Sequence, residues 1–338
     1  MRRKMWRAAF ARVVLVSLFV LWTQAAARSQ DLKKVSLVET VHHIFFSPLY
    51  IADGLGYFRE EGIQLEYTAS QGGDKAMAAL LTGDVDVALI GPEAVIYVQN
   101  SQSPTKVKMF CGLTASDGTF LVGRDSKAPF DWQQLKGKSI ITFRPGSTPA
   151  LFLDEALRRN GLDPAKDVTL ISNIGIPARL GAFLSGQGDF ATFFEVDLTK
   201  LEREKKGTVL LSIGQAIGPV DYTAFVATDA YIAKNPGILQ GWTKAIARAL
   251  KWINDAPPAE AAKVLQPFFP GISLDLLESA VVRQREAHLW KATPAIKPEA
   301  MEMFQKLQVA GGILKEAQKV SFDRIVAPQF FAAELKAK

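Results

Sequence analysis

The chain has 338 residues, 48% of them hydrophobic, which is enough to bury a large core, and the length favours two lobes over one. Its formal net charge is +6, but residues 1–27 hold five basic side chains and no acidic one, so the remainder carries only +1. A nearly neutral protein gives no support to nucleic-acid binding, and we expect no nucleic-acid partner.

The first 27 residues have the pattern of a secretory signal peptide. Four basic side chains lie within the first seven residues, and the apolar run Val13–Trp22 that follows is short for a membrane span. Ala25-Ala26-Ala27 then supplies a small-residue cleavage site. We therefore predict an exported, periplasmic protein cleaved near Ala27, with a retained membrane anchor as the alternative.

Alternating strands and helices are predicted from residue 35 onward. Val35–Thr40 reads as a strand, Ser47-Pro48 is typical of a helix start, and Gln64–Tyr67 alternates like a strand, which together have the size of a βαβ unit. Cys111 lies in an apolar run and is predicted to be a buried strand residue. Further helices are predicted at Ala76–Leu81 and Ala94–Gln99, and strands at Asp86–Ile90, Thr105–Thr114 and Thr119–Gly123.

The same alternation begins again near Phe130. Strands are predicted at Ser139–Phe143, Val168–Ser172, Asp189–Phe194 and Thr208–Ile213, and helices at Ala150–Asn160, Ala178–Leu184 and Asp197–Lys206. An offset of 103 positions takes Gly83 to Gly186 and Asp86 to Asp189. This repetition predicts two similar lobes, each an open α/β sheet.

After an extended segment at Tyr222–Thr228, the chain is predicted to be almost wholly helical. The expected helices are Gly237–Asn254, Ala259–Phe268, Leu274–Arg285, Pro298–Val309 and Ile325–Leu335. We expect this tail to pack on lobe I, formed by residues 31–119 and 225–338, with residues 120–224 forming lobe II. Two strand-like crossings near Phe120 and Ala224 would then form a hinge.

Four segments resemble a known family. They are FSPLYIADGLGYFREEGIQLEY, GDVDVALIGPEAVI, LKGKSIITFRPGSTPALFLDEALRRNGLDP and DYTAFVATDAYIAKNPGILQGWTKAI. The chain resembles the periplasmic substrate-binding proteins of the nitrate, sulfonate, taurine and thiamine-precursor group, which serve ABC importers. The resemblance covers nearly all of residues 34–256. It implies a two-lobed type II periplasmic-binding-protein fold, with a small solute held between the lobes and with an ABC permease and its ATPase as partners.

Ligands of open α/β sheets bind beyond the carboxyl ends of the strands, so the loops there supply the candidate site. The candidate ligand-binding residues are His42, His43, Phe46, Gly91, Glu93, Ser147, Thr148, Gly175 and Glu195. Each has a simpler explanation as well, because Glu93 and Thr148 are also suited to helix capping and a histidine can satisfy backbone groups. Arg144 and Arg179 are the best candidates for an anionic group, although exposed arginines are the usual case.

The function predicted from these residues is capture of a solute by hinge closure. Two carboxylate candidates and nearby aromatic rings favour a flat, nitrogen-bearing solute such as a pyrimidine. A sulfonate, taurine, nitrate or other small anion is the alternative, favoured by Thr148 and an arginine. An enzyme on the same fold, similar to a pyrimidine synthase or a dehydratase, and a sensor ectodomain are rival interpretations. We predict no catalytic residue, cofactor or metal site, and we expect a monomer.

Overall fold

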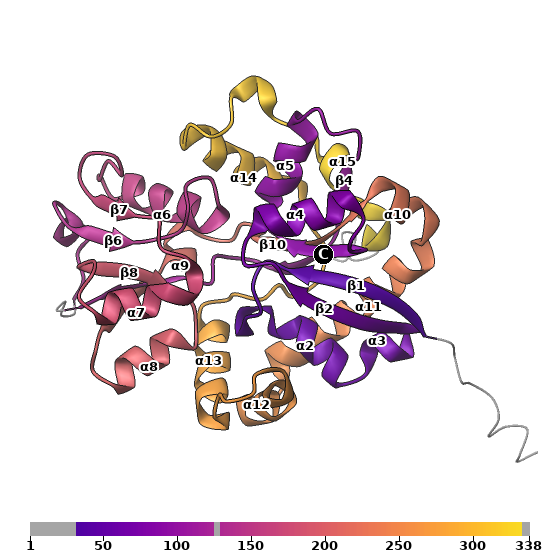
Figure 1. Ribbon diagram of the computed structural model, residues 1–338, viewed down its shortest axis with the longest axis horizontal. Coiled ribbons are helices and arrows are strands. Elements are labelled where there is room, and N and C mark those ends of the chain that lie inside the picture. The colour runs from indigo at the N-terminus through magenta and orange to yellow at the C-terminus, as the bar shows by residue number, and fades with distance from the viewer. Residues whose placement is uncertain (1–31, 125–128, 333–338) are drawn as a thin grey trace, which may run out of the picture. The chain divides into compact units, whose positions relative to one another are not determined.

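The computed structural model describes residues 32–124 and 129–332, so the predicted signal peptide lies outside the described residues. Two five-stranded mixed sheets organise the structure (Figure 1). The first contains β1 (Lys33–Glu39), β2 (Ile63–Ala69), β3 (Val87–Ile90), β4 (Val107–Thr114) and β10 (Thr223–Thr228). The second contains β5 (Phe120–Gly123), β6 (Ser139–Ile141), β7 (Thr169–Ile171), β8 (Phe190–Phe193) and β9 (Thr208–Ser212). We call the parts built on these sheets lobe I and lobe II.

Helices connect the strands within each lobe. Lobe I contains α2 (Ser47–Gly54), α3 (Tyr57–Glu60), α4 (Gly73–Thr82) and α5 (Pro92–Asn100), and lobe II contains α6 (Thr148–Arg159), α7 (Arg179–Leu184), α8 (Asp197–Arg203) and α9 (Ile213–Ile217). The C-terminal tail contains α10 (Asp229–Lys234), α11 (Pro236–Asp255), α12 (Pro258–Leu265), α13 (Leu274–Glu286), α14 (Pro298–Ala310) and α15 (Phe322–Ile325). Most predicted elements are therefore found within a few residues of their expected bounds.

The two lobes share one plan, as the internal repeat predicted. Their strand orders are β2-β1-β3-β10-β4 and β7-β6-β8-β5-β9, and the fourth strand of each is the one antiparallel to its neighbours. The repeat extends to side chains. The Asp86 carboxylate accepts hydrogen bonds from the backbone N–H and hydroxyl of Ser36, and Asp189 does the same with Ser139, 103 positions later.

The chain passes between the lobes twice. The segments are 115–119, between β4 and β5, and 218–222, between α9 and β10. Neither is a strand, which differs from our expectation, and both lie a few residues before the predicted positions. They nevertheless run side by side, since the N–H groups of Val220 and Tyr222 donate to the carbonyls of Ala115 and Thr114 at 2.9 and 3.1 Å.

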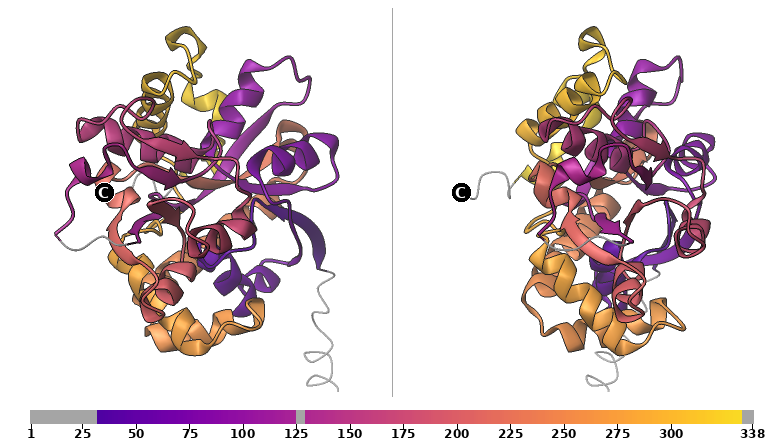
Figure 2. Two further views of the ribbon diagram at one scale, coloured as in Figure 1. Left: turned by 60° about the vertical axis from the view of Figure 1, so that its left-hand side comes forward. Right: turned by 90° about the vertical axis from the view of Figure 1, so that its left-hand side faces the viewer.

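The helical tail packs on lobe I, and it also reaches lobe II. Trp242 of α11 is fully buried, with its ring 4.9 Å from that of Phe58 and 5.1 Å from that of Phe225. Helix α13 contacts α8, and α14 contacts α6 (Figures 1 and 2). Two helices of the tail thus contact lobe II, which sequence patterning did not predict.

The predicted helix Ile325–Leu335 is wrong over its described part. Helix α15 ends at Ile325, Val326 pairs with Met109 as an isolated bridge, and the Ala327 N–H donates to the Met109 carbonyl at 2.8 Å. Pro328 then opens a short 3-10 turn. Pairing with β4 therefore outweighs local helix propensity here; residues 333–335 lie outside the described residues.

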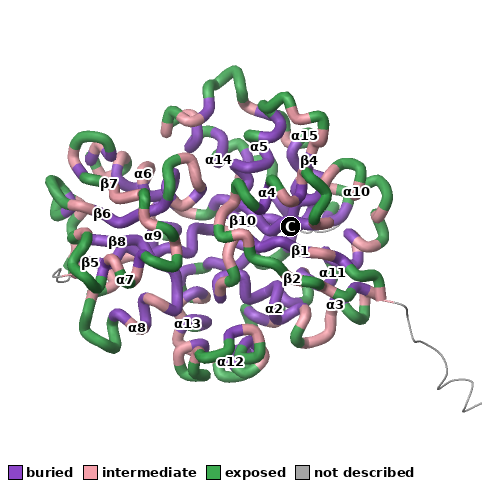
Figure 3. The backbone as a smooth tube through the Cα atoms, in the orientation of Figure 1, coloured by how far each residue is buried: buried purple, intermediate pink, exposed green. Residues whose placement is uncertain are grey.

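The core runs through both sheets and beneath the tail (Figure 3). Strands β3, β5 and β8 are buried along their whole length, as expected for strands covered by helices on both faces. Cys111 is fully buried in β4, as predicted. Within residues 32–124 and 129–332, every helix is too short or too polar to cross a bilayer.

Candidate functional site

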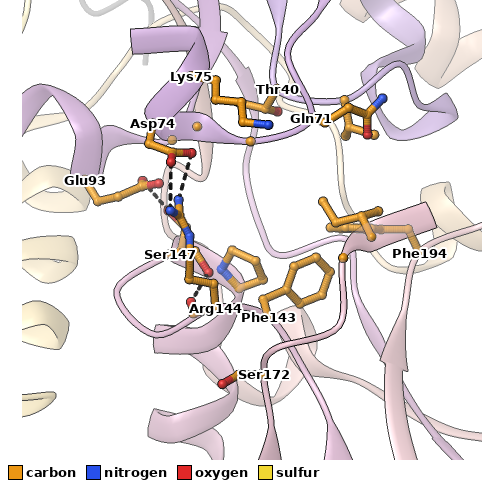
Figure 4. A pocket seen from close by; sticks show the side chains of 18 of the residues that line it. Thr40, Gln71, Asp74, Lys75, Glu93, Phe143, Arg144, Ser147, Ser172 and Phe194 are labelled. Carbon is orange, nitrogen blue, oxygen red and sulfur yellow. Dashed lines mark hydrogen bonds and ion pairs between the residues drawn. The ribbon is translucent and has the colours of Figure 1, made fainter. Parts of the chain in front are cut away.

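A cavity of about 430 Å³ lies where the two lobes face each other. Its lining includes the residues that follow four strands: Thr40 after β1, Gly91 after β3, Phe143 near the end of β6, and Phe194 after β8. Figure 4 shows side chains of lobe I facing those of lobe II across this space. The cavity is therefore at the carboxyl ends of the strands, where an open α/β sheet binds ligands.

Polar contacts cross from one lobe to the other beside the cavity. Arg144 of lobe II donates two hydrogen bonds to Asp74 of lobe I, at 2.9 and 3.1 Å (Figure 4). The Thr148 hydroxyl donates to the Glu93 carboxylate, and the Tyr97 hydroxyl donates to the Gly146 carbonyl at 2.9 Å. These contacts hold the two lobes against each other at the edge of the cavity.

Gly91 makes the contact between Thr148 and Glu93 possible. A Cβ atom at this position would overlap a Glu93 carboxylate oxygen and would lie 2.6 Å from the Thr148 hydroxyl. The backbone of Gly91 is ordinary, with φ of −73°, so the requirement is one of space and not of conformation. A side chain here would force the Glu93 carboxylate and the Thr148 hydroxyl out of their present positions.

An aromatic contact also joins the lobes. The ring of Phe45, from the 3-10 turn Ile44–Phe46 of lobe I, stacks on that of Phe194 of lobe II, with centroids 4.9 Å apart and an interplanar angle of 3°. The His43 ring lies 5.2 Å from Phe194. Phe45 and Phe194 therefore provide a flat apolar wall of the cavity.

Arg179 is the least satisfied charge on the cavity wall. Its side chain is buried, its guanidinium lies 3.7 Å from the centre of the Phe143 ring, and its Nε donates to the Ile174 carbonyl at 3.2 Å. Its Nη1 is buried and has no partner among the described residues. Burial lowers the pKa of Arg179 to about 10, so the group is still charged at neutral pH.

Three helices of lobes I and II begin at the same cavity. Their first residues or caps, Gly73 in α4, Gly91 before α5 and Thr148 in α6, all line it. Helix starts carry free N–H groups and a partial positive charge. The charged side chains of the lining are Lys75, Arg144 and Arg179 against Asp74 and Glu93. Burial raises the pKa of Glu93. With three positive side chains against two negative ones, the charges of the lining favour a negatively charged ligand.

A second cavity of about 390 Å³ adjoins the first. The two share Val41, Gln71, Phe143, Ile176, Arg179 and Phe194 in their linings. The rest of the second wall includes His42, His43, Leu180, Glu195 and Ile272. Arg179 and the Phe143 ring on which it stacks thus lie between the two cavities. The sequence had predicted a single site here.

The two predicted histidines have different surroundings. His42 is held by a buried carboxylate, with Nδ1 3.1 Å from Glu39 Oε1 and Nε2 2.8 Å from the Phe268 carbonyl. The hydrogen bond to Glu39 raises the pKa of His42 despite partial burial. Burial and the charge of His42 lower the pKa of His43 to about 3, so the His43 ring is neutral, and its Nδ1 accepts from the Phe45 N–H.

Glu195 is neutralised within the protein. Its carboxylate is fully buried, lies 2.6 Å from Nε of Arg283, and accepts from the Thr199 hydroxyl at 3.0 Å. Burial raises its pKa, and the positive charge of Arg283 opposes that change. A packing role for Glu195 is sufficient to explain these contacts, since its charge already has a partner from the tail.

The predicted site residues are divided between the two cavities. Gly91, Glu93, Ser147, Thr148 and Gly175 line the first, as do Arg144 and Arg179; His42, His43 and Glu195 line the second. Phe46 is fully buried and lines neither cavity, because the 3-10 turn directs it into the core and leaves Phe45 at the wall. Ligand contact by any of these residues stays a prediction.

Several lining residues were not predicted. Phe143 and Phe194 come directly at the ends of predicted strands, so the rule that selected Gly91 could have selected them. Glu39 lines neither cavity, but it holds His42 and ends a strand whose last three residues are buried. Tyr222 and Gln71 line the first cavity from distant segments and had no such signal.

Three comparisons place the chain among known proteins. Residues 44–261 match the model of the family described as NMT1/THI5 like. The putative binding protein YtlA of Bacillus subtilis is 34% identical over 299 residues, covering 88% of this chain and 90% of that protein.

Among solved structures, the periplasmic nitrate-binding protein NrtA from Synechocystis PCC 6803 has a TM-score of 0.75 at 14% identity, covering 91% of this chain and 89% of that one. The alkanesulfonate-binding protein SsuA from Xanthomonas axonopodis pv. citri, bound to MOPS, has a TM-score of 0.71 at 16% identity, covering 86% and 97%. These structures share the two-lobed periplasmic-binding-protein fold. With this fold, the family match and the relative in Bacillus, the chain is a member of the NMT1/THI5-like family.

Proposed function

We propose that this protein is the periplasmic solute-binding component of an ABC importer, and that its two lobes close on a small organic acid. Family membership and the binding proteins of similar sequence or fold support the transport role. The cavity between two lobes joined by two short segments supports hinge closure, in which the ligand stabilises the form that the permease recognises.

The buried guanidinium of Arg179, whose Nη1 has no hydrogen-bond partner among the described residues, carries the preference for an acid. A buried charge without a partner is costly unless something neutralises it, and a carboxylate or sulfonate matches the geometry of a guanidinium. The starts of α4, α5 and α6 would add to the attraction. This argument favours the anionic alternative over the pyrimidine that the sequence suggested first.

A pyrimidine is the second candidate because of Glu93. This carboxylate is nearly fully buried, accepts from Thr148, and could accept a further hydrogen bond from a ring N–H or amino group. Phe45, Phe143 and Phe194 would stack on a flat ring.

A thermal-shift panel on the purified mature protein separates the two candidates. It compares carboxylates and sulfonates with pyrimidines and amines, at matched concentrations and pH 7. We expect the acids to raise the melting temperature, since a ligand that binds only the folded state stabilises it by mass action. Shifts with the pyrimidines alone would reject the organic acid and leave the importer role intact.

Incubation with the bound solute tests the enzyme interpretation. We expect the solute to be recovered unchanged, and appearance of a product would overturn the transport role.

Size-exclusion chromatography with light scattering tests the expected monomer. The ABC permease and ATPase are expected partners, and ligand-dependent ATP hydrolysis by a reconstituted importer would test that assignment.

A further inference from the structure

The second cavity shares part of its wall with the first. Six lining residues are common to both, and two of them, Phe143 and Arg179, are stacked at 3.7 Å. A group bound to the Arg179 guanidinium is therefore at the junction of two spaces of about 430 and 390 Å³. We call these spaces the first and second chambers.

We propose that the solute occupies both chambers, with its acidic group at Arg179 and an apolar or aromatic body in the second chamber. This rests on the proposed function and narrows it to elongated organic acids. An inorganic or two-carbon acid would leave most of the space empty, because pockets of about 300–1,000 Å³ are typical of drug-sized ligands.

The surface of the second chamber suits such a body. Leu180 and Ile272 contribute aliphatic side chains from α7 and from the tail, and Phe269 contributes a buried ring. His43 is neutral there, and its ring lies among those of Phe45 and Phe194. An uncharged imidazole and aromatic edges accept an apolar group with little desolvation cost.

The charges of this chamber are largely neutralised by the protein itself. His42 is hydrogen-bonded to Glu39, and Glu195 is paired with Arg283. Asp197 and Lys200 are the other charged residues of the wall besides the shared Arg179, and they have opposite signs. Among the described residues of this wall, Arg179 is the charged residue that has a buried donor without a hydrogen-bond partner. The acidic group of the solute would therefore lie at the junction, and its apolar body would lie beyond it in the second chamber.

Isothermal titration with two carboxylates tests the proposal. Benzoate and 4-phenylbutanoate share an acidic group and one ring, but the second extends further from the carboxylate. We expect 4-phenylbutanoate to bind at least tenfold more tightly. Equal affinities would overturn the two-chamber site while leaving the acid-binding proposal standing, whereas the absence of binding by either acid would count against the proposed function itself.

A variant that fills the second chamber provides a second test. Leu180→Trp puts a large ring into the second chamber, and we expect it to weaken 4-phenylbutanoate binding at least tenfold and benzoate binding less than threefold. Leu184→Trp is the control, because Leu184 is exposed on the same helix and lines neither chamber. Should Leu180→Trp not fold, Ile272→Trp fills the chamber from the tail. Equal losses for both acids would contradict the proposal.

Discussion

Arg179 carries a stability cost that its proposed role in binding would explain. Its charge is buried, its Nη1 is unpartnered among the described residues, and its nearest aromatic neighbour is Phe143. Local strain and buried charges are commonly retained at binding sites, where a ligand supplies the missing interaction.

Replacing Arg179 tests this trade-off. We expect Arg179→Met to stabilise the ligand-free protein by about 1 kcal/mol, since Met can pack on Phe143 without a buried charge. The same change should weaken binding of an organic acid at least tenfold. Thermal unfolding and titration calorimetry measure the two effects, and a destabilised variant with unchanged affinity would assign Arg179 to packing alone.

Asp117 is a buried acidic residue in the first crossing segment, 115–119. Its carboxylate accepts from the N–H and hydroxyl of Thr119 at 2.8 and 2.9 Å. Burial raises the pKa of Asp117 to about 7. Between the ordinary value near 4 and pH 7, the folded state therefore holds a proton that the unfolded state has lost.

This pKa predicts the sign of one pH effect. The contribution of Asp117 to the free energy of unfolding decreases as the pH rises from about 4 to 7, because the folded state binds more protons over that range. Asp117→Asn removes the contribution, so the stability of the variant relative to the unmodified protein should increase with pH. Urea unfolding at pH 5 and pH 7 measures the difference. A difference that is the same at both values would show that Asp117 is ionised in the folded state.

Helix α13 shows how one element joins regions distant in sequence. It belongs to the C-terminal tail, yet its Arg283 contacts Glu195 and Glu202 of lobe II, and its Asp275 contacts Arg203 of α8. We expect these contacts to restrict the movement of the two lobes beside α13 during the proposed hinge closure.

The buried and the exposed ion pairs of α13 should differ in strength. Arg283→Met leaves the buried Glu195 without a positively charged partner, and we expect the free energy of unfolding to fall by about 3 kcal/mol. Arg203→Met breaks a pair whose side chains are 45% and 64% exposed, and its effect should be below about 1 kcal/mol. Denaturant unfolding compares them, and equal losses would indicate that Glu195 is protonated or solvated.

For the molecule as a whole, closure depends on how near the lobes can approach. The structure brings Thr148 of lobe II onto Glu93 of lobe I at the position where Gly91 has no side chain. Arg144 and Asp74 meet at the same edge, but both are more than half exposed and can separate into water at little cost.

Gly91→Ala should therefore affect closure more than folding. We expect at least a tenfold loss of solute affinity, because the added methyl group would displace the Glu93 carboxylate and the Thr148 hydroxyl from their contact between the lobes. The change in unfolding free energy should be below about 1 kcal/mol, since both displaced groups are side-chain ends and the backbone at Gly91 is unstrained. Gly237→Ala, where a Cβ would meet nothing within 4 Å, is the control and should leave affinity unchanged. Unchanged affinity in Gly91→Ala would show that the lobes close without this contact.

The sequence by itself determined the two α/β lobes, the helical tail and the loops that face the cavity, since these follow from hydrophobic periodicity, turn residues and a repeat that recurs down to Ser36–Asp86 and Ser139–Asp189. Only the tertiary structure decided which side chains in those loops are available. Glu195 is neutralised by Arg283 from the distant tail, and the 3-10 turn places Phe45 at the cavity wall instead of Phe46. The Nη1 of Arg179 is left without a hydrogen-bond partner among the described residues. Such pairings depend on contacts between distant segments, whose distances no local pattern encodes.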